Sequence, residues 1–231
     1  MIAPYYSEPG ITLYHADCRD LLPSLLPAES IITDPIWPNC QRAFPDVDAW
    51  LLFGQAARLF PAVAERIVVH LGCSSDPRFL NGLPMALPFL RVCWLEYVRC
   101  SYNGRLLNGS DIAYIFGKPP RPQPGQILMS GKCLATRADR GTILKNHRLA
   151  EHGDTGDFHP TPRNLQHLRW LVKWYGGASV IDPFMGAGTT ALACKELGIP
   201  FTGIEIEERY CQIAIARLAQ SVLPLEAPLA C

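Results

Sequence analysis

Hydrophobic positions along the chain alternate between short continuous runs and longer stretches with helical spacing. The short runs predict strands at 11–14, 30–33, 66–71, 89–99, 111–118, 178–182 and 201–205. The stretches with apolar residues three and four apart predict helices at 48–60, 189–197 and 208–218. A fourth helix is expected after 160, with Thr161 as its cap and Pro162 at its first position. Its apolar face would carry Leu165, Leu168, Leu171 and Tyr175.

This alternation predicts an α/β domain with a largely parallel sheet. At 231 residues, 48% hydrophobic and 18% charged, the chain is long enough for one globular domain with a small insertion. No apolar run is long enough to span a bilayer, and the N-terminal stretch lacks the pattern of an export signal. We therefore expect a cytoplasmic protein without membrane contact.

The cysteines and histidines do not form a metal-binding pattern. The nine cysteines are scattered, odd in number and without a C-x-x-C pair, which favours free thiols in a reducing compartment. His147, His152 and His159 lie near one another in the sequence, but no cysteine or acid has the spacing of a zinc site. The sequence predicts no bound metal.

Positive charge is concentrated in one segment, although the formal net charge is zero. Between 118 and 148 the only acidic residue is Asp139. The basic residues there are Lys118, Arg121, Lys132, Arg137, Arg140, Lys145 and Arg148. The same segment contains GKPPRPQPGQ, which is typical of a solvated loop. Two interpretations stay open, a soluble surface insertion and a lobe that contacts nucleic-acid phosphates.

The strongest chemical signal is VIDPFMGAGTT at 180–190. A strand ends at Asp182, and a helix begins near Thr189 after a turn that contains Gly186 and Gly188. Glycines permit a tight turn and the close approach of a ligand, and a helix start offers free N–H groups. The next strand ends at Glu205, where a carboxylate can accept both hydroxyls of a ribose.

A second signal is IITDPIW at 31–37, where a buried strand ends on an acid followed closely by an aromatic residue. Such a strand end places a carboxylate and a flat aromatic ring side by side at the mouth of the sheet.

Taken together, these motifs resemble those of DNA amino-methyltransferases. DPFMGAGTT with GIEIEERYCQIAIARL is similar to their S-adenosylmethionine-binding half, and TDPIW to their catalytic motif. FHPTPRNLQHLRWLV and LYHADCRDLLPSL are similar to the segments that flank the cofactor. The order, with the catalytic motif first, resembles the permuted β class. The resemblance implies a Rossmann-like methyltransferase fold, with a mostly parallel seven-stranded sheet and helices on both faces.

The resemblance divides the chain into three parts. Residues 1–118 would form the catalytic half, 119–157 a short basic insertion for target recognition, and 158–231 the cofactor-binding half. The implied catalytic residues are Asp34, Pro35, Ile36 and Trp37. The implied cofactor-binding residues are Asp17, Cys18, His159, Thr161, Asp182, Phe184, Gly186, Gly188, Thr189 and Glu205. Asp17 would accept from the adenine amine and Glu205 from the ribose, while the turn residues line the methionine side; Asp17 as a simple turn cap stays open.

Two residues depart from the family pattern. Ile36 replaces the second proline of the catalytic motif, which adds an N–H and removes a rigid φ angle but no acceptor. Arg163 stands where the family often has Lys-Pro, so no role carries over to that side chain.

The implied activity is transfer of a methyl group from S-adenosylmethionine to the exocyclic amine of a flipped base in double-stranded DNA. Aspartate in the first motif position favours adenine N6 over cytosine N4. Because the insertion is short, the target sequence should be short or loosely specified. The implied setting is restriction-modification in a bacterial or phage-infected host cell, and a homodimer is left open. Two other interpretations remain, a catalytically impaired nucleic-acid-binding relative and a methyltransferase acting on a protein amide or small amine.

Overall fold

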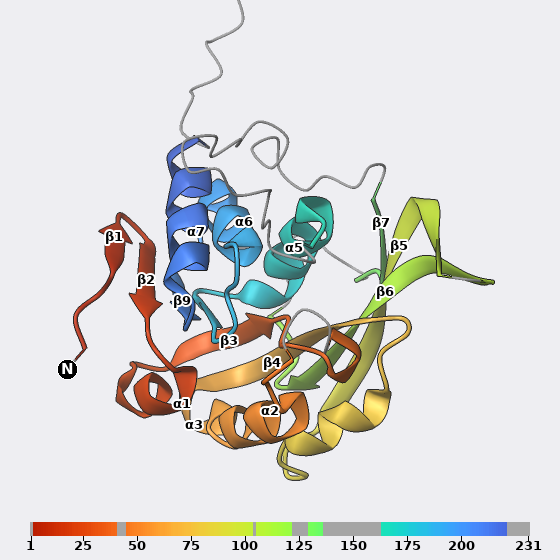
Figure 1. Cartoon of the computed structure of the whole chain (residues 1–231), viewed down its shortest axis with the longest axis horizontal. Coiled ribbons are helices and arrows are strands. Elements are labelled where there is room, and N and C mark those ends of the chain that lie inside the picture. The colour runs from red at the N-terminus through yellow and green to blue at the C-terminus, as the bar shows by residue number, and fades with distance from the viewer. Residues whose placement is uncertain (1, 41–44, 104, 122–128, 136–162, 221–231) are drawn as a thin grey trace, which may run out of the picture.

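The computed structural model describes residues 2–40, 45–103, 105–121, 129–135 and 163–220 (Figure 1). Its strands are β1 (Tyr6–Glu8), β2 (Ile11–His15), β3 (Ala28–Thr33), β4 (Ala64–Gly72), β5 (Phe89–Asn103), β6 (Leu106–Gly117), β7 (Lys132–Ala135), β8 (Val180–Asp182) and β9 (Phe201–Glu205). The α-helices are α1 (Cys18–Leu21), α2 (Ala49–Ala57), α3 (Phe60–Val63), α5 (Leu165–Leu171), α6 (Thr189–Leu197) and α7 (Glu208–Gln220). Short 3₁₀ turns occupy Leu22–Ser24, Pro38–Cys40 and Pro77–Gly82, and a π turn at Val172–Gly176 extends α5.

Within the described residues, the strands form one mixed sheet of nine strands in the order β1-β2-β9-β8-β3-β4-β6-β5-β7. The central strands β2, β9, β8, β3 and β4 are parallel, as the alternating pattern predicts. The expectation of a mostly parallel seven-stranded sheet needs correction, because β1 and β6 pair antiparallel with their neighbours. The edge strands β1 and β7 account for the two additional strands; each has only three or four residues, too few to show a hydrophobic period.

Helices cover both faces of the sheet, as expected. Figure 1 shows α5, α6 and α7 on one face and α1, α2 and α3 on the other. The first face packs Leu165, Leu168, Leu171 and Tyr175 against the sheet, and all four are buried as the sequence predicts. The opposite core contains Phe53, Phe60 and Phe79. Burial of this apolar surface on both sides holds the strand ends in fixed positions.

Local signals explain most helix ends. Asp48 caps α2 by accepting from the Leu51 amide, and α6 ends at Gly198 in the left-handed conformation. The helix expected after 160 begins later than predicted, since α5 starts at Leu165 and Asn164 is its cap. The proposed cap Thr161 lies outside the described residues.

The segment 119–157 is partly regular where it is described. Residues 132–135 form strand β7, which pairs in parallel with β5 and buries Ala135. That stretch is therefore part of the sheet rather than a loop. No helix in the described part of the chain is long and apolar enough to cross a membrane.

Candidate active site at the carboxyl ends of the parallel strands

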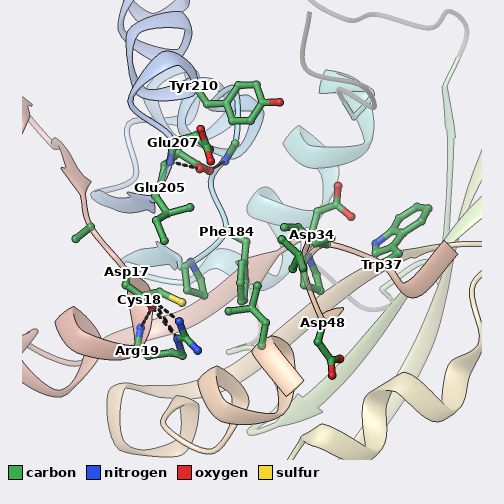
Figure 2. A pocket seen from close by; sticks show the side chains of 18 of the residues that line it. Asp17, Cys18, Arg19, Asp34, Trp37, Asp48, Phe184, Glu205, Glu207 and Tyr210 are labelled. Carbon is green, nitrogen blue, oxygen red and sulfur yellow. Dashed lines mark hydrogen bonds and ion pairs between the residues drawn. The ribbon is translucent and has the colours of Figure 1, made fainter. Parts of the chain in front are cut away.

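A pocket of about 480 Å³ opens at the carboxyl ends of the parallel strands. In open α/β sheets this edge is where ligands bind. Figure 2 shows Asp17, Cys18, Glu205 and Tyr210 toward one end of the pocket, Asp34 and Trp37 toward the other, with Phe184 between them. The charged side chains that line it are Asp17, Arg19, Asp34, Asp46, Asp48, Arg163, Glu205 and Glu207. Acids outnumber arginines, so the pocket favours a ligand that carries positive charge.

The turn between β8 and α6 fixes one wall of the pocket. Glu205, at the end of β9, accepts from the Gly186 amide at 2.8 Å and from the Glu207 amide at 2.8 Å. Gly186 has a φ of 54°, which favours glycine, and it lines the pocket together with Phe184. Burial raises the pKa of the Glu205 carboxyl, and the backbone hydrogen bonds oppose that change. The carboxylate is thus held at the pocket wall with acceptor capacity left for a ligand.

Gly188 and Thr189, which are expected to bind the cofactor, are not among the residues that line the main pocket, and their contact with a cofactor stays a prediction. Gly188 has a φ of 75°, and a Cβ built on it would lie 2.7 Å from the Ala214 Cβ of α7. The Thr189 hydroxyl accepts from Arg217 at 3.1 Å, and the residue borders only a small cavity of about 40 Å³ beside the pocket. The requirement for glycine at 188 is therefore explained by helix packing.

Replacing Gly188 by alanine should destabilise the fold by about 2–4 kcal/mol, since it adds both a left-handed strain and a clash with α7. The midpoint of urea unfolding would measure the loss. Gly54→Ala is the matched control, because Gly54 lies inside α2 and a Cβ added there would meet nothing within 4 Å. This control should be neutral or slightly stabilising. Equal midpoints for Gly188→Ala and the native protein would contradict the packing role.

Asp17 and Cys18 occupy the opposite wall, at the start of α1. The Asp17 carboxylate accepts from the Arg19 amide at 2.8 Å and from the Arg19 guanidinium. The hydrogen bond from Arg19 lowers the pKa of Asp17. Asp17 is thus a helix cap, and it also lines the pocket, as Cys18 does. Its contact with a cofactor amine stays a prediction.

Asp182 connects the two halves of the site. Its carboxyl group accepts from the Thr33 hydroxyl at 2.8 Å and from the Phe184 amide at 3.1 Å. Burial raises its pKa to about 7. Asp182 borders the small cavity and not the main pocket, so it holds the turn and the end of β3 in register.

Asp34 follows β3 and is engaged by Arg163, a residue to which the sequence pattern assigns no role. Arg163 donates to both carboxylate oxygens, from Nε at 2.5 Å and from Nη2 at 2.9 Å. Its guanidinium carbon also lies 3.7 Å from the ring centroid of Trp37. Burial raises the pKa of Asp34, and the charge of Arg163 opposes that change. Pro35 and Ile36 line the pocket beside this pair.

Trp37 is 8% exposed and lines the pocket. Its indole packs on Gly72 at the end of β4, where a Cβ would lie 2.3 Å from the ring. The glycine therefore makes room for the indole. The guanidinium of Arg163 covers one face of the ring, and the stacking of a target base on Trp37 stays a prediction.

Behind this pair lies a buried cluster around Asp111 of β6. Its Oδ2 accepts from the Tyr97 hydroxyl at 2.6 Å, lies 3.2 Å from His70 Nε2 and accepts from Arg163 Nη1 at 3.4 Å. Burial raises the pKa of Asp111, but His70, Arg163 and Tyr97 outweigh this effect and bring the pKa to about 2. His70 thus packs in the interior, and the described residues contain no cluster that could hold a metal.

The basic residues of the expected nucleic-acid surface are only partly described. Lys118 follows β6 and pairs with Glu65 at 2.8 Å. Because β6 runs antiparallel to β4, Lys118 lies at the edge of the sheet opposite the pocket, and its contact with nucleic acid stays a prediction. Arg121 is exposed three residues later, and Lys132 begins β7, 3.7 Å from Glu96. Arg137, Arg140, Lys145 and Arg148, like the cofactor candidates His159 and Thr161, lie outside the described residues.

Comparison with solved structures shows the same architecture in DNA methyltransferases. The M1.HpyAVI-SAM complex matches with a TM-score of 0.64 and 23% identity, covering 90% of this chain and 98% of that one. The cytosine-N4-specific PvuII DNA methyltransferase matches with a TM-score of 0.66 and 16% identity, covering 94% and 89%. At these identities the likeness shows the fold.

Sequence comparison identifies the family. The type II methyltransferase M.SmaI from Serratia marcescens is 40% identical over 57 residues, which is 25% of this chain and 20% of that protein. The match thus spans about a fifth of that relative. The family described as DNA methylase, N6_N4_Mtase, matches residues 101–216, half of the chain. Since this match includes the turn and Glu205, the chain belongs to the N6_N4_Mtase family of DNA methylases.

Proposed function

We propose that this protein transfers a methyl group from S-adenosylmethionine to the exocyclic amine of a base extruded from double-stranded DNA, with adenine N6 as the target. The observation that carries the proposal is the convergence of Asp34 and the Glu205–Gly186 turn on one pocket. One end offers acceptors for an amine, and the other offers acceptors for a ribose.

The described residues fit S-adenosylmethionine in charge and in hydrogen-bonding groups. The ligand is cationic at its sulfonium and its ammonium, and the pocket is rich in carboxylates. Glu205 would bind the ribose hydroxyls, and Asp17 with the Cys18 backbone would bind the adenine. Phe184 and Gly186 would line the rest of the ligand. When bound, the cofactor supplies an electrophilic methyl group.

The chemistry assigned to this chain is the positioning of the amine. An exocyclic amine is a weak nucleophile, because its lone pair is delocalised into the ring of the base. Asp34 and the Pro35 carbonyl would each accept one amine hydrogen, which localises the lone pair on nitrogen and stabilises positive charge as it develops. Extruding the base costs a few kcal/mol, and stacking on Trp37 returns about 1–3 kcal/mol.

Two target atoms are candidates for the methyl group, adenine N6 and cytosine N4. Aspartate at position 34 supports adenine, whereas the likeness to a cytosine-N4-specific enzyme supports cytosine N4 as the second candidate. The test is incubation with S-adenosylmethionine and unmethylated DNA of mixed sequence, followed by digestion to nucleosides and mass spectrometry. N6-methyl-2′-deoxyadenosine is the expected product; N4-methyl-2′-deoxycytidine would select the alternative. Transfer to neither base would reject the activity and favour a catalytically impaired DNA-binding relative.

We expect the basic segment to contact DNA phosphates. Replacing Arg137 and Arg140 together by alanine should weaken DNA binding about equally for all sequences and reduce the salt dependence, because each phosphate contact releases a counterion. Fluorescence anisotropy at several salt concentrations measures both quantities. The matched control is Arg78→Ala, which removes an exposed arginine paired with Asp76. Unchanged affinity in the double variant would contradict the assignment of this segment.

A further inference from the structure

Arg163 occupies the position that the proposed reaction reserves for the target base. Its planar guanidinium lies 3.7 Å from the Trp37 ring centroid, as a stacked base would. Two of its N–H groups donate to the two oxygens of Asp34, at 2.5 and 2.9 Å, so it uses the carboxylate that would accept an amine hydrogen of the base. The planar guanidinium thus stacks on the aromatic ring and donates two hydrogen bonds to the carboxylate.

The indole face that Arg163 covers cannot hold a base at the same time. Trp37 is 8% exposed, and its ring packs on Gly72. The guanidinium of Arg163 covers the face of the ring that lies toward it. Both Asp34 oxygens already accept from the guanidinium. A base that stacks on this face of the indole must therefore displace Arg163 from Trp37, and its amine competes with the guanidinium for Asp34.

A second anchor for the displaced arginine is already present. The Nη1 of Arg163 lies 3.4 Å from Oδ2 of Asp111, which Tyr97 and His70 hold in place. Arg163 is 12% exposed in its side chain and Asp111 is 11% exposed, so the pair is largely shielded from water. The carboxylates of Asp34 and Asp111 thus flank the guanidinium of Arg163. A small displacement of this guanidinium would exchange one carboxylate for the other.

Resting on the proposed function, we propose that Arg163 is a positioning residue of the target-base site. In the free protein, Arg163 binds Asp34 and Trp37 where the base would bind. It moves to Asp111 when the base enters. Apparent affinity for an extruded base is then reduced by the fraction of molecules in which Arg163 still occupies the site.

The test measures binding of isolated bases, so it depends neither on the recognition sequence nor on methyl transfer. The probes are 9-methyladenine and 1-methylcytosine, titrated by saturation-transfer NMR with S-adenosylhomocysteine filling the cofactor end. Arg163→Ala should bind at least one of them about fivefold or more tightly than the native protein. Arg163→Lys should be intermediate, because a lysine pairs with Asp34 as a point charge and covers the indole poorly.

Two further variants separate this role from a structural one. Asp111→Asn removes the second anchor and should weaken base binding, the opposite sign to Arg163→Ala. Arg78→Ala, at an exposed ion pair, should leave base binding unchanged. Thermal unfolding and calorimetry with S-adenosylhomocysteine verify that each variant is folded with an intact cofactor end.

Equal or weaker base binding by Arg163→Ala overturns the proposal, and so does the absence of base binding in every variant. Unchanged binding by Asp111→Asn overturns the part assigned to Asp111. If the native protein methylates no DNA while Arg163→Ala gains affinity for a base, the proposed function fails and the placement of Arg163 stands.

Discussion

Replacing Asp34 by alanine is expected to reduce methyl transfer to DNA by about 10²–10³-fold, the usual effect of removing one preorganised polar group that stabilises developing charge. Asp34→Asn should retain much more activity, because an amide oxygen can still accept one amine hydrogen. This difference distinguishes an acceptor from a general base, since asparagine cannot take up a proton. The measurement is the initial rate of labelled methyl incorporation into mixed DNA at saturating cofactor.

Asp76→Asn is the matched control for Asp34→Asn. Asp76 caps the turn at Pro77–Gly82 and pairs with the exposed Arg78, away from the pocket residues, and asparagine caps equally well. The control should keep the native rate. If Asp34→Asn proves as inactive as Asp34→Ala, the acceptor role gives way to proton abstraction. If Asp34→Ala stays fully active, the catalytic assignment fails.

Replacing Glu205 by alanine should weaken the binding of S-adenosylmethionine about 10²–10⁴-fold, because it removes two hydrogen bonds to a charged group, each of which contributes about 1.5–3 kcal/mol. The two backbone amides that donate to Glu205 would also lose their partner, which loosens the turn at Gly186. At saturating cofactor the rate should recover more fully than the affinity, as expected for a group that binds substrate and transition state alike.

Titration calorimetry with S-adenosylhomocysteine measures the effect on affinity directly. Glu208→Gln serves as the control, since Glu208 lies only three residues away in α7 and accepts from the exposed Tyr5 hydroxyl. It should bind with native affinity. Native affinity in Glu205→Ala would place the cofactor elsewhere.

The sequence predicts well those elements whose ends are marked by local chemistry. Helix α6 and strand β9 have the predicted boundaries, because Gly198 ends the helix and a hydrophobic run follows. A predicted boundary is wrong where several residues could cap the helix, as at α5, which begins at Leu165 with Asn164 as its cap. Short edge strands such as β7 also escape prediction, because their pairing with β5 decides their conformation.

The sequence predicts the two strand ends of the candidate site, but it does not predict the contacts between the side chains there. The sequence indicates Asp34 and Glu205 because an acid at the end of a buried strand is a local pattern. The contact between Arg163 and Asp34 joins residues 129 positions apart, and no spacing in the sequence indicates it. The family pattern does not indicate this contact, because it often has Lys-Pro where this chain has Arg163. Similarly, glycine at 188 is explained by Ala214 of another helix, which only the folded chain brings near.

The hydrogen bond between Thr33 and Asp182 joins residues 149 positions apart at the ends of two adjacent strands. Together with the pairing of β3 and β8, this side-chain contact fixes the distance between Asp34 and the turn that follows β8. Under the proposed function, exchanging polypeptide in the basic segment 119–157 would change which DNA is approached and would leave that distance constant. A new recognition segment could therefore be grafted there without moving Asp34 or Gly186.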